Sequence, residues 1–177
     1  MALVEVTLTK GAAQDSVEVR RGGGAPMRFT FPKKGPIPHD YVHFVVEDAF
    51  GFSRGFWGMI ADGAAPAEIQ EIAKAGGHAS AARAQIPAPE IVELIQAERL
   101  VECFEADLWG APADGDTFRG VAAAACAHSL VPCPVLADER IVATRKRIAD
   151  FARAWMAAPL GAQFSFQWSA RLDAESG

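Results

Sequence analysis

The chain has 177 residues, of which half are hydrophobic and 22% are charged, and its formal net charge is −5. This composition excludes an intrinsically disordered chain, and the length is sufficient to bury one hydrophobic core without disulfides or metals as supports. The acidic balance also argues against nucleic acid or an anionic membrane as a partner, because binding to either depends on a concentrated basic surface.

Three short segments near the N-terminus alternate apolar and polar residues with period two, the pattern of strands that bury one face. They span residues 4–9, 17–20 and 27–31. The stretches between them are short and rich in turn residues. We therefore predict an antiparallel β-meander over residues 1–32, whose apolar face needs a cover.

Residues 38–157 form a region in which the hydrophobic pattern has the period of a helix. We predict a first helix that Gly51 ends, a second over 56–63 that Ser53 caps, and a third that begins at Pro66. Residues 78–88 are expected to form a loop. Three further helices follow: the longest of all, opened by Pro89, then one over 121–130 capped by Asp116 or Thr117, and one over 138–156.

Residues 162–172 return to strict alternation, with Phe164, Phe166 and Trp168 on one side. This final strand most economically pairs with the edge of the N-terminal sheet. The sequence thus predicts an α+β fold, in which about four antiparallel strands form one sheet that five to six helices cover. No linker divides the chain, so we expect residues 1–177 to form a single domain.

The start of the chain lacks the basic n-region of a signal peptide, and no apolar run approaches the roughly 20 residues that span a bilayer. The three cysteines, Cys103, Cys126 and Cys133, have no C-x-x-C spacing, and we expect buried free thiols. Together these features predict a cytoplasmic protein.

The first predicted helix carries side chains able to do chemistry, in the order Pro38-His39-Asp40, His43 and Glu47. At about 100° per residue, His39, His43 and Glu47 lie on one stripe, with Asp40 at its edge. Imidazole and carboxylate groups spaced one turn apart can hold a divalent transition metal such as zinc. We therefore predict His39, His43 and Glu47 as metal ligands.

The run from His39 to His43 resembles the H-E-x-x-H helix of zinc metalloproteases. That resemblance implies that Asp40 is the general base acting on a metal-bound water, and that Glu47 is a third ligand or an orienting group. A purely structural interpretation stays open beside it. In that interpretation Asp40 caps the helix, and His43 forms a hydrogen bond with Glu47 one turn later.

Residues 38–47, followed by Gly51-Phe52 and Gly55-Phe56-Trp57-Gly58, resemble a group of small bacterial proteins of unassigned function. These proteins carry a P-H-D-x-x-H-x-x-x-E segment after an N-terminal pair of strands. The resemblance covers the first third of the chain. It implies the same β-then-α arrangement, and it implies no activity.

Three weaker clusters have structural interpretations that we favour. The ridge Glu98, Glu102 and Glu105 is typical of a solvated helix face. The basic residues of the last predicted helix are expected on an outer surface with pairing inside the chain: Arg140, Arg145, Lys146, Arg147 and Arg153. The aromatic residues that follow the first helix are expected in the core: Phe50, Phe52, Phe56 and Trp57.

Two functions are compatible with these patterns. In the first, the chain is a non-catalytic binding or assembly module, which contacts another protein or a second copy of itself through the surface near residues 52–57 or the last helix. In the second, it binds a divalent metal and acts as a metal-dependent hydrolase through the His39, Asp40, His43 and Glu47 helix. Short motif matches often arise by chance, so the sequence alone favours the module.

Overall fold

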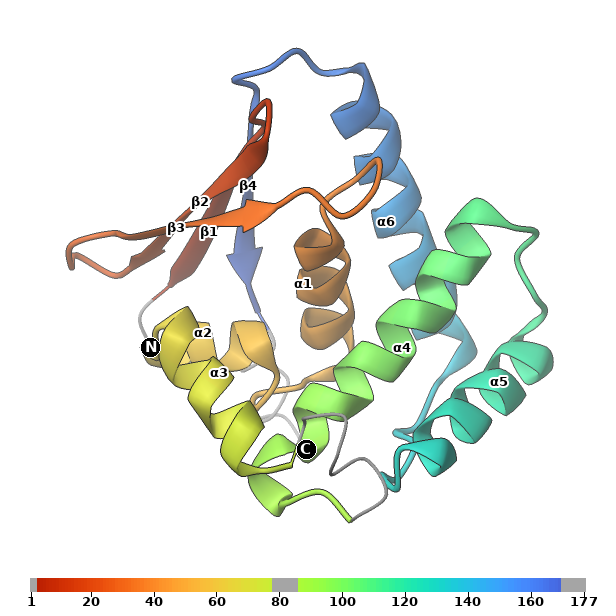
Figure 1. Cartoon of the computed structure of the whole chain (residues 1–177). Helices are drawn as coiled ribbons and strands as arrows, with labels where there is room; N and C mark the ends of the chain where they lie inside the picture. Colours follow the sequence, from red (N-terminus) through yellow and green to blue (C-terminus); the bar gives the residue numbers. More distant parts are fainter. Residues whose placement is uncertain (1–2, 78–85, 170–177) are drawn as a thin grey trace.

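The computed structural model describes residues 3–77 and 86–169. Strands β1 (Val4–Thr9), β2 (Gln14–Arg21) and β3 (Met27–Pro32) form the expected meander, and β4 (Gln163–Trp168) pairs antiparallel with β1. The resulting sheet has the strand order β3-β2-β1-β4 (Figure 1). The predicted α+β fold with one sheet of four antiparallel strands is therefore confirmed. The last residues of the predicted final strand, 170–172, lie outside the described residues.

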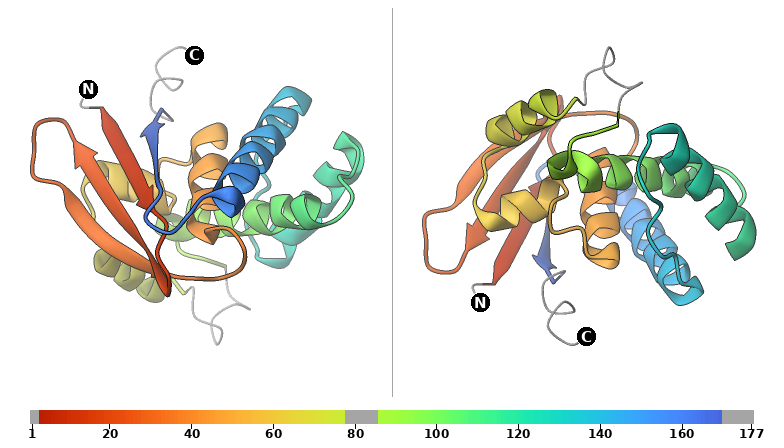
Figure 2. Two further views of the ribbon diagram at one scale, coloured as in Figure 1. Left: turned by 90° about the horizontal axis from the view of Figure 1, so that it is seen from above. Right: turned by 90° about the horizontal axis from the view of Figure 1, so that it is seen from below.

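Six α-helices lie between β3 and β4 in the described part of the chain. They are α1 (His39–Phe50), α2 (Phe56–Asp62), α3 (Pro66–Ala75), α4 (Val92–Trp109), α5 (Gly115–His128) and α6 (Asp138–Ala157), with a 3-10 turn, η2 (Pro89–Ile91), before α4. Helix α1 lies against the sheet, α4 and α6 pack on α1, and α5 is outermost (Figure 2). None of these helices is long and apolar enough to cross a membrane.

Helix α1 lies at the centre of the molecule, because it has neighbours on several sides. Its Phe44 ring lies 5.8 Å from that of Phe166 and 5.5 Å from that of Trp168, both on β4. On its other sides α1 contacts α2, α4 and α6. All residues from 41 to 48 are consequently buried, the polar ones included.

Several predicted helix ends differ from the observed ones, among them both ends of α5, which spans Gly115–His128 and not 121–130. Ser53 does not cap α2, whose N-cap is Gly55. Asp114, not Asp116 or Thr117, caps α5, because its carboxylate accepts the Thr117 N–H at 2.9 Å. The helix after Pro89 has 18 residues and is shorter than α6, which has 20, because the first residues form the 3-10 turn instead.

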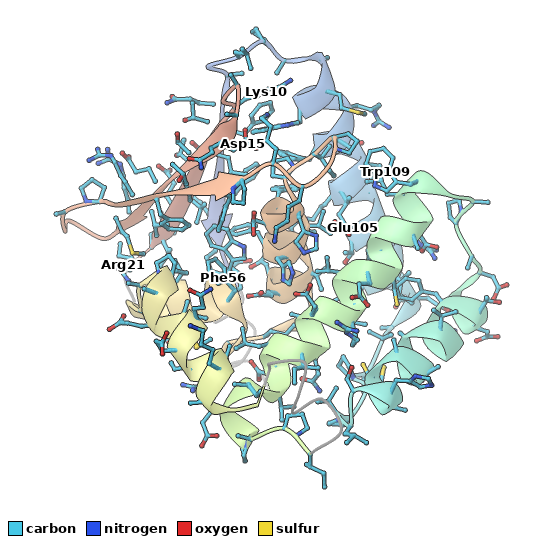
Figure 3. The ribbon with its side chains drawn as sticks, viewed as in Figure 1. Lys10, Asp15, Arg21, Phe56, Glu105 and Trp109 are labelled. Carbon is cyan, nitrogen blue, oxygen red and sulfur yellow. The ribbon has the colours of Figure 1, made fainter. Side chains whose placement is uncertain are left out.

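Lys10, in the turn after β1, fastens the sheet to the end of α6 (Figure 3). Its Nζ donates hydrogen bonds to the carbonyl oxygens of Trp155, at 2.8 Å, and Ala158, at 2.7 Å. The last carbonyls of a helix have no partner within the helix, so a lysine there satisfies them and complements the helix dipole. This contact holds α6 against the same core that contains α1.

Candidate metal centre between helices α1 and α4

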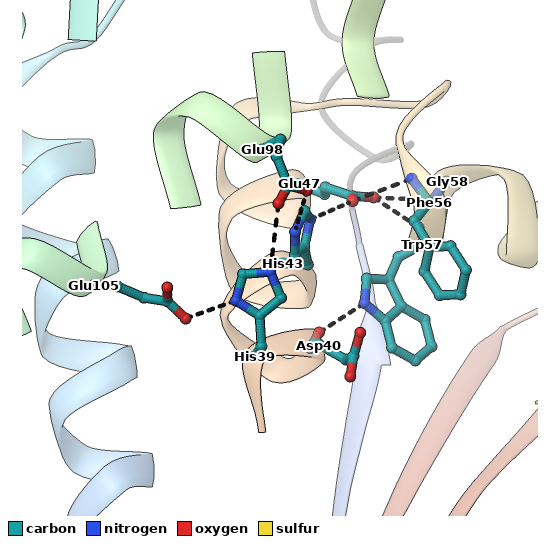
Figure 4. Close-up of polar contacts among 9 residues, drawn as sticks. All are labelled: His39, Asp40, His43, Glu47, Phe56, Trp57, Gly58, Glu98 and Glu105. Carbon is teal, nitrogen blue, oxygen red and sulfur yellow. Dashed lines mark hydrogen bonds and ion pairs between the residues drawn. The ribbon is translucent and has the colours of Figure 1, made fainter. Parts of the chain in front are cut away.

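Helix α1 brings His39 and His43 together because residues four apart lie on the same side of a helix. The helix begins at His39, directly after Pro38, and Gly51 ends it in the left-handed conformation, with φ of 72°. The two imidazole rings lie 4.8 Å apart between centroids. Both rings face Glu98 on α4 (Figure 4), so α4 covers the predicted polar stripe.

Both imidazoles direct their Nε2 atoms at the same carboxylate, that of Glu98. The Nε2 of His43 lies 3.0 Å from one Glu98 oxygen, and the Nε2 of His39 lies 3.6 Å from the other. One ligand atom from each of these three residues lies within 4.8 Å of the other two. Within residues 3–77 and 86–169, no other group of three histidine, cysteine or acidic side chains comes this close.

The Nδ1 atom of each imidazole contacts a second carboxylate. Nδ1 of His39 lies 2.8 Å from an oxygen of Glu105, and Nδ1 of His43 lies 3.4 Å from an oxygen of Glu47. Glu105 lies between α4 and α1 (Figure 3). A carboxylate that accepts the Nδ1 proton of a neutral imidazole leaves the lone pair on Nε2, which is the arrangement that metal-bound histidines use.

Glu47 is fully buried, and its carboxylate also holds the start of α2. It accepts the backbone N–H groups of Phe56 at 3.1 Å, Trp57 at 2.7 Å and Gly58 at 3.4 Å. These N–H groups belong to the first turn of α2, where backbone N–H groups have no hydrogen-bond acceptor within the helix. Glu47 therefore takes the place of the predicted Ser53 cap. It lies outside the group of three converging ligand atoms and contacts the site through His43.

Gly55 lies directly beside the Glu47 carboxylate, and its lack of a side chain leaves space for that carboxylate. A Cβ atom at position 55 would lie 2.5 Å from an oxygen of Glu47 and 2.6 Å from its carboxyl carbon. Any side chain at this position would displace the carboxylate from the N–H groups of α2. The glycine is therefore required by the position of Glu47.

Asp40 lies on a different side of α1 from the two imidazoles. Its carboxylate points toward the Trp57 indole and not toward Glu98 (Figure 4), and its backbone carbonyl accepts the indole N–H at 2.8 Å. Burial raises the pKa of Asp40, while the charges of His43 and His39 oppose that rise. The alternative role as a helix cap is not observed, since Pro38 occupies the N-cap position.

The contacts within the cluster shift the pKa values of the two imidazoles and of Glu98. Hydrogen bonds to Glu105 and Glu98 raise the pKa of His39 to about 9. Burial lowers the pKa of His43, but the hydrogen bonds to Glu47 and Glu98 outweigh it and raise the value to about 10. Burial likewise opposes the change at Glu98, yet the two imidazoles hold its pKa well below the usual range. The cluster therefore binds positive charge between its carboxylates.

Glu98 and Glu105 correct the prediction that the acidic ridge of α4 is solvated. Only Glu102 is exposed, where it pairs with Arg99 at 3.0 Å, whereas the side chains of Glu98 and Glu105 are 32% and 28% exposed. Residues seven apart are nearly aligned on a helix, but Glu102 lies only about one turn from each of them. No signal in the sequence therefore separates the two carboxylates that face α1 from the exposed one. His128 lies exposed at the end of α5, and His78 lies outside the described residues.

Of the two surfaces predicted for a protein partner, the aromatic one lies in the core, whereas the charged outer face of α6 stays exposed. Phe52 and Trp57 are buried, and Phe50 and Phe56 pack against the core, as predicted. The basic side chains of α6 all have partners within the chain. Arg145 pairs with Asp107, Arg147 with Asp48, and Lys146 and Arg153 with Asp150, while Arg140 donates to the carbonyl of Ala49.

No protein-family model matches the sequence, and no curated protein or solved structure matches it either. The resemblance to small bacterial proteins therefore remains a prediction.

Proposed function

We propose that the chain binds one divalent transition metal ion, of the zinc class, through Nε2 of His39, Nε2 of His43 and the carboxylate of Glu98. Each imidazole faces the shared carboxylate with Nε2 and a separate carboxylate with Nδ1, and this arrangement carries the proposal. Glu105 and Glu47 would then orient the two ligating rings. Compared with the sequence prediction, Glu98 takes the place of Glu47 as the third ligand.

The charge of the cluster supports the same proposal. Three carboxylates, those of Glu47, Glu98 and Glu105, surround two imidazoles at a partly buried position. Buried carboxylates of like charge repel one another unless a cation or protons compensate them. A divalent ion between the two Nε2 atoms and Glu98 would supply this compensation at the point where the carboxylates converge.

The ligand types favour zinc, iron or manganese over calcium or magnesium, because neutral imidazole nitrogen is a poor ligand for the hard cations. Two histidines and one carboxylate also make up the protein ligands of some catalytic zinc sites. The hydrolase prediction further requires a base beside the ion. Asp40 points toward Trp57, so our proposal is metal binding and gives Asp40 no catalytic role.

Metal binding now ranks ahead of the non-catalytic binding or assembly module that the sequence favours. The aromatic residues predicted for a contact surface lie in the core, and the α6 charges are paired. The proposed metal centre, in contrast, includes the carboxylates of Glu98 and Glu105, which the sequence predicts in solvent.

We expect the protein, purified without chelator, to retain zinc, manganese or iron at about one ion per chain, because one cluster supplies three ligand atoms. His43→Ala removes one ligand and should release the ion, whereas His128→Ala removes an exposed imidazole and should not. Elemental analysis of the three proteins checks this. Substoichiometric metal in the wild type, even after reconstitution with Zn²⁺, would reject the proposal.

The affinity for Zn²⁺ should rise with pH over the neutral range, because the metal replaces protons. In the metal-free protein the pKa values of His39 and His43, raised to about 9 and about 10, keep both imidazoles protonated at pH 7. Binding then releases up to two protons, and the apparent affinity should increase by up to about 100-fold per pH unit between pH 6 and 8. Calorimetry in buffers of different ionisation enthalpy counts these protons. An affinity independent of pH would contradict the ligand assignment.

A further inference from the structure

A cavity of about 190 Å³ lies between the last turns of α4 and the middle of α6. The two helices contact each other in this part of the molecule (Figure 1). The lining is mostly apolar, with one polar wall, and its helical residues are Phe104, Asp107, Leu108, Arg145, Ile148 and Ala149. None of the proposed metal ligands lines this cavity, so it is separate from the metal centre.

The polar wall of the cavity is an ion pair that is fixed in position. The Nε and Nη2 atoms of Arg145 both donate to one oxygen of Asp107, at 2.8 Å and 2.5 Å. The other Asp107 oxygen accepts the N–H of Ala113 at 3.3 Å. The Arg145 guanidinium also lies 5.1 Å from the centre of the Phe118 ring, a distance at which a cation and an aromatic ring attract each other. The guanidinium is therefore held in place before any ligand binds.

The volume of the cavity suits one aromatic ring with a small substituent. An apolar cavity of about 150 Å³ is known to bind benzene, so this one has room for about one or two further atoms. Phe104 and Ile148 are almost fully buried and offer apolar surface to a ring. Gly110 and Pro112 also line the cavity and are exposed, so a ligand can enter from solvent.

The ion pair decides which substituent the ring can carry. Asp107 already compensates the charge of Arg145, and a carboxylate on the ligand would bring a second negative charge beside Asp107, whose side chain is only 10% exposed. An uncharged oxygen avoids that repulsion. Among residues 3–77 and 86–169 the Nη1 atom of Arg145 has no hydrogen-bond acceptor, so it is free to donate to such an oxygen.

We propose that this cavity binds a small molecule made of one aromatic ring and one uncharged oxygen, of the phenol class. The ring packs between Phe104 of α4 and Ile148 of α6, and the oxygen accepts a hydrogen bond from Arg145. Binding needs no metal ion, so the test of this proposal is independent of the test of the metal centre.

Phenol is the probe, and an NMR titration of the ¹⁵N-labelled full chain measures its binding. We expect one saturable site with a Kd of about 1 mM or tighter, a range typical of ligands with so few atoms. The backbone amides that shift should lie in 104–112 and 145–149. Benzoate has the same ring but a negative charge, and it should bind at least about tenfold more weakly because it meets Asp107.

Two alanines on α6 give a matched pair of variants. Ala149→Leu adds three carbon atoms to the wall of the cavity and should weaken phenol binding at least about tenfold. Ala143→Leu makes the same change at an exposed position of the same helix and should leave the Kd within about twofold of the wild type. Similar affinities in these two variants would mean that phenol binds elsewhere, and the proposal would fail.

Arg145→Lys tests the hydrogen bond to the oxygen, because it keeps the positive charge beside Asp107 but removes Nη1. Phenol should lose about fivefold in affinity, whereas toluene, which has no oxygen, should lose none. An equal loss for both probes would contradict the role of Arg145. Benzoate binding as tightly as phenol, or no saturable shifts in 104–112 and 145–149 of the wild type, would overturn the proposal even where a variant does not fold.

Discussion

Glu98→Gln is expected to lower the affinity of the chain for Zn²⁺ by more than about 100-fold, because removing even an outer orienting group costs about 10–100-fold. Glu98 is the acceptor at which both Nε2 atoms converge, at 3.0 Å and 3.6 Å. An amide keeps the shape of the side chain but lacks the negative charge and is a weaker ligand. Competition with a chromophoric chelator measures the affinity, and circular dichroism confirms that the variant is folded.

Glu102→Gln is the matched control for this substitution. It lies one turn further along the same helix and carries the same change of charge, but it is exposed and pairs with Arg99. It should leave the affinity for Zn²⁺ within about threefold of the wild type, since charges in solvent are strongly screened. Equal losses in Glu98→Gln and Glu102→Gln would mean that the effect is general electrostatics, and Glu98 would not be a ligand.

Glu47→Ala is expected to lower the free energy of unfolding by about 3–5 kcal/mol, the range observed when one partner of a buried charged network is removed. The fully buried carboxylate accepts three backbone N–H groups of α2 and contacts His43. Its loss leaves those donors without partners and opens a cavity at the centre of the molecule. Urea unfolding in the presence of a chelator measures this cost in the metal-free protein.

Glu105→Ala serves as the comparison for Glu47→Ala. Glu105 also contacts one imidazole, but it is partly exposed and caps no helix among the described residues. Its removal should cost about 1 kcal/mol. If Glu47→Ala were destabilising only when metal is bound, Glu47 would be a ligand as the sequence predicts. Equal destabilisation by the two variants would also contradict the role of Glu47 in holding α2.

The sheet and the order of the helices were predictable, because alternation over residues 4–9 and 163–168 and helical period between them are local properties of the sequence. The local signals were weaker at helix ends. Ser53 is a good capping residue by type, yet α2 is capped by a carboxylate from α1. A cap that comes from another helix leaves no signal near the end that it caps.

The two histidines of the candidate site could be identified from their spacing, but their carboxylate partners could not. Glu98 and Glu105 lie on a helix far along the chain, where charged residues on one side normally indicate solvent. Only the packing of α4 over the polar stripe of α1 shows that this side is inside. Glu47 was assigned as a ligand for the same reason. Its spacing is correct, but its carboxylate accepts N–H groups of α2 and reaches the site only through His43.

The close fit between Glu47 and Gly55 links two short motifs that are separate in the printed sequence. An alanine at position 55 would displace the Glu47 carboxylate, which contacts the His43 imidazole. At position 58, the Cβ atom of an alanine would lie 2.3 Å from the Ser53 carbonyl oxygen. A search for related chains should therefore demand both glycines together with the histidines. A sequence that keeps P-H-D-x-x-H-x-x-x-E but has a bulkier residue at either position could not build the same centre.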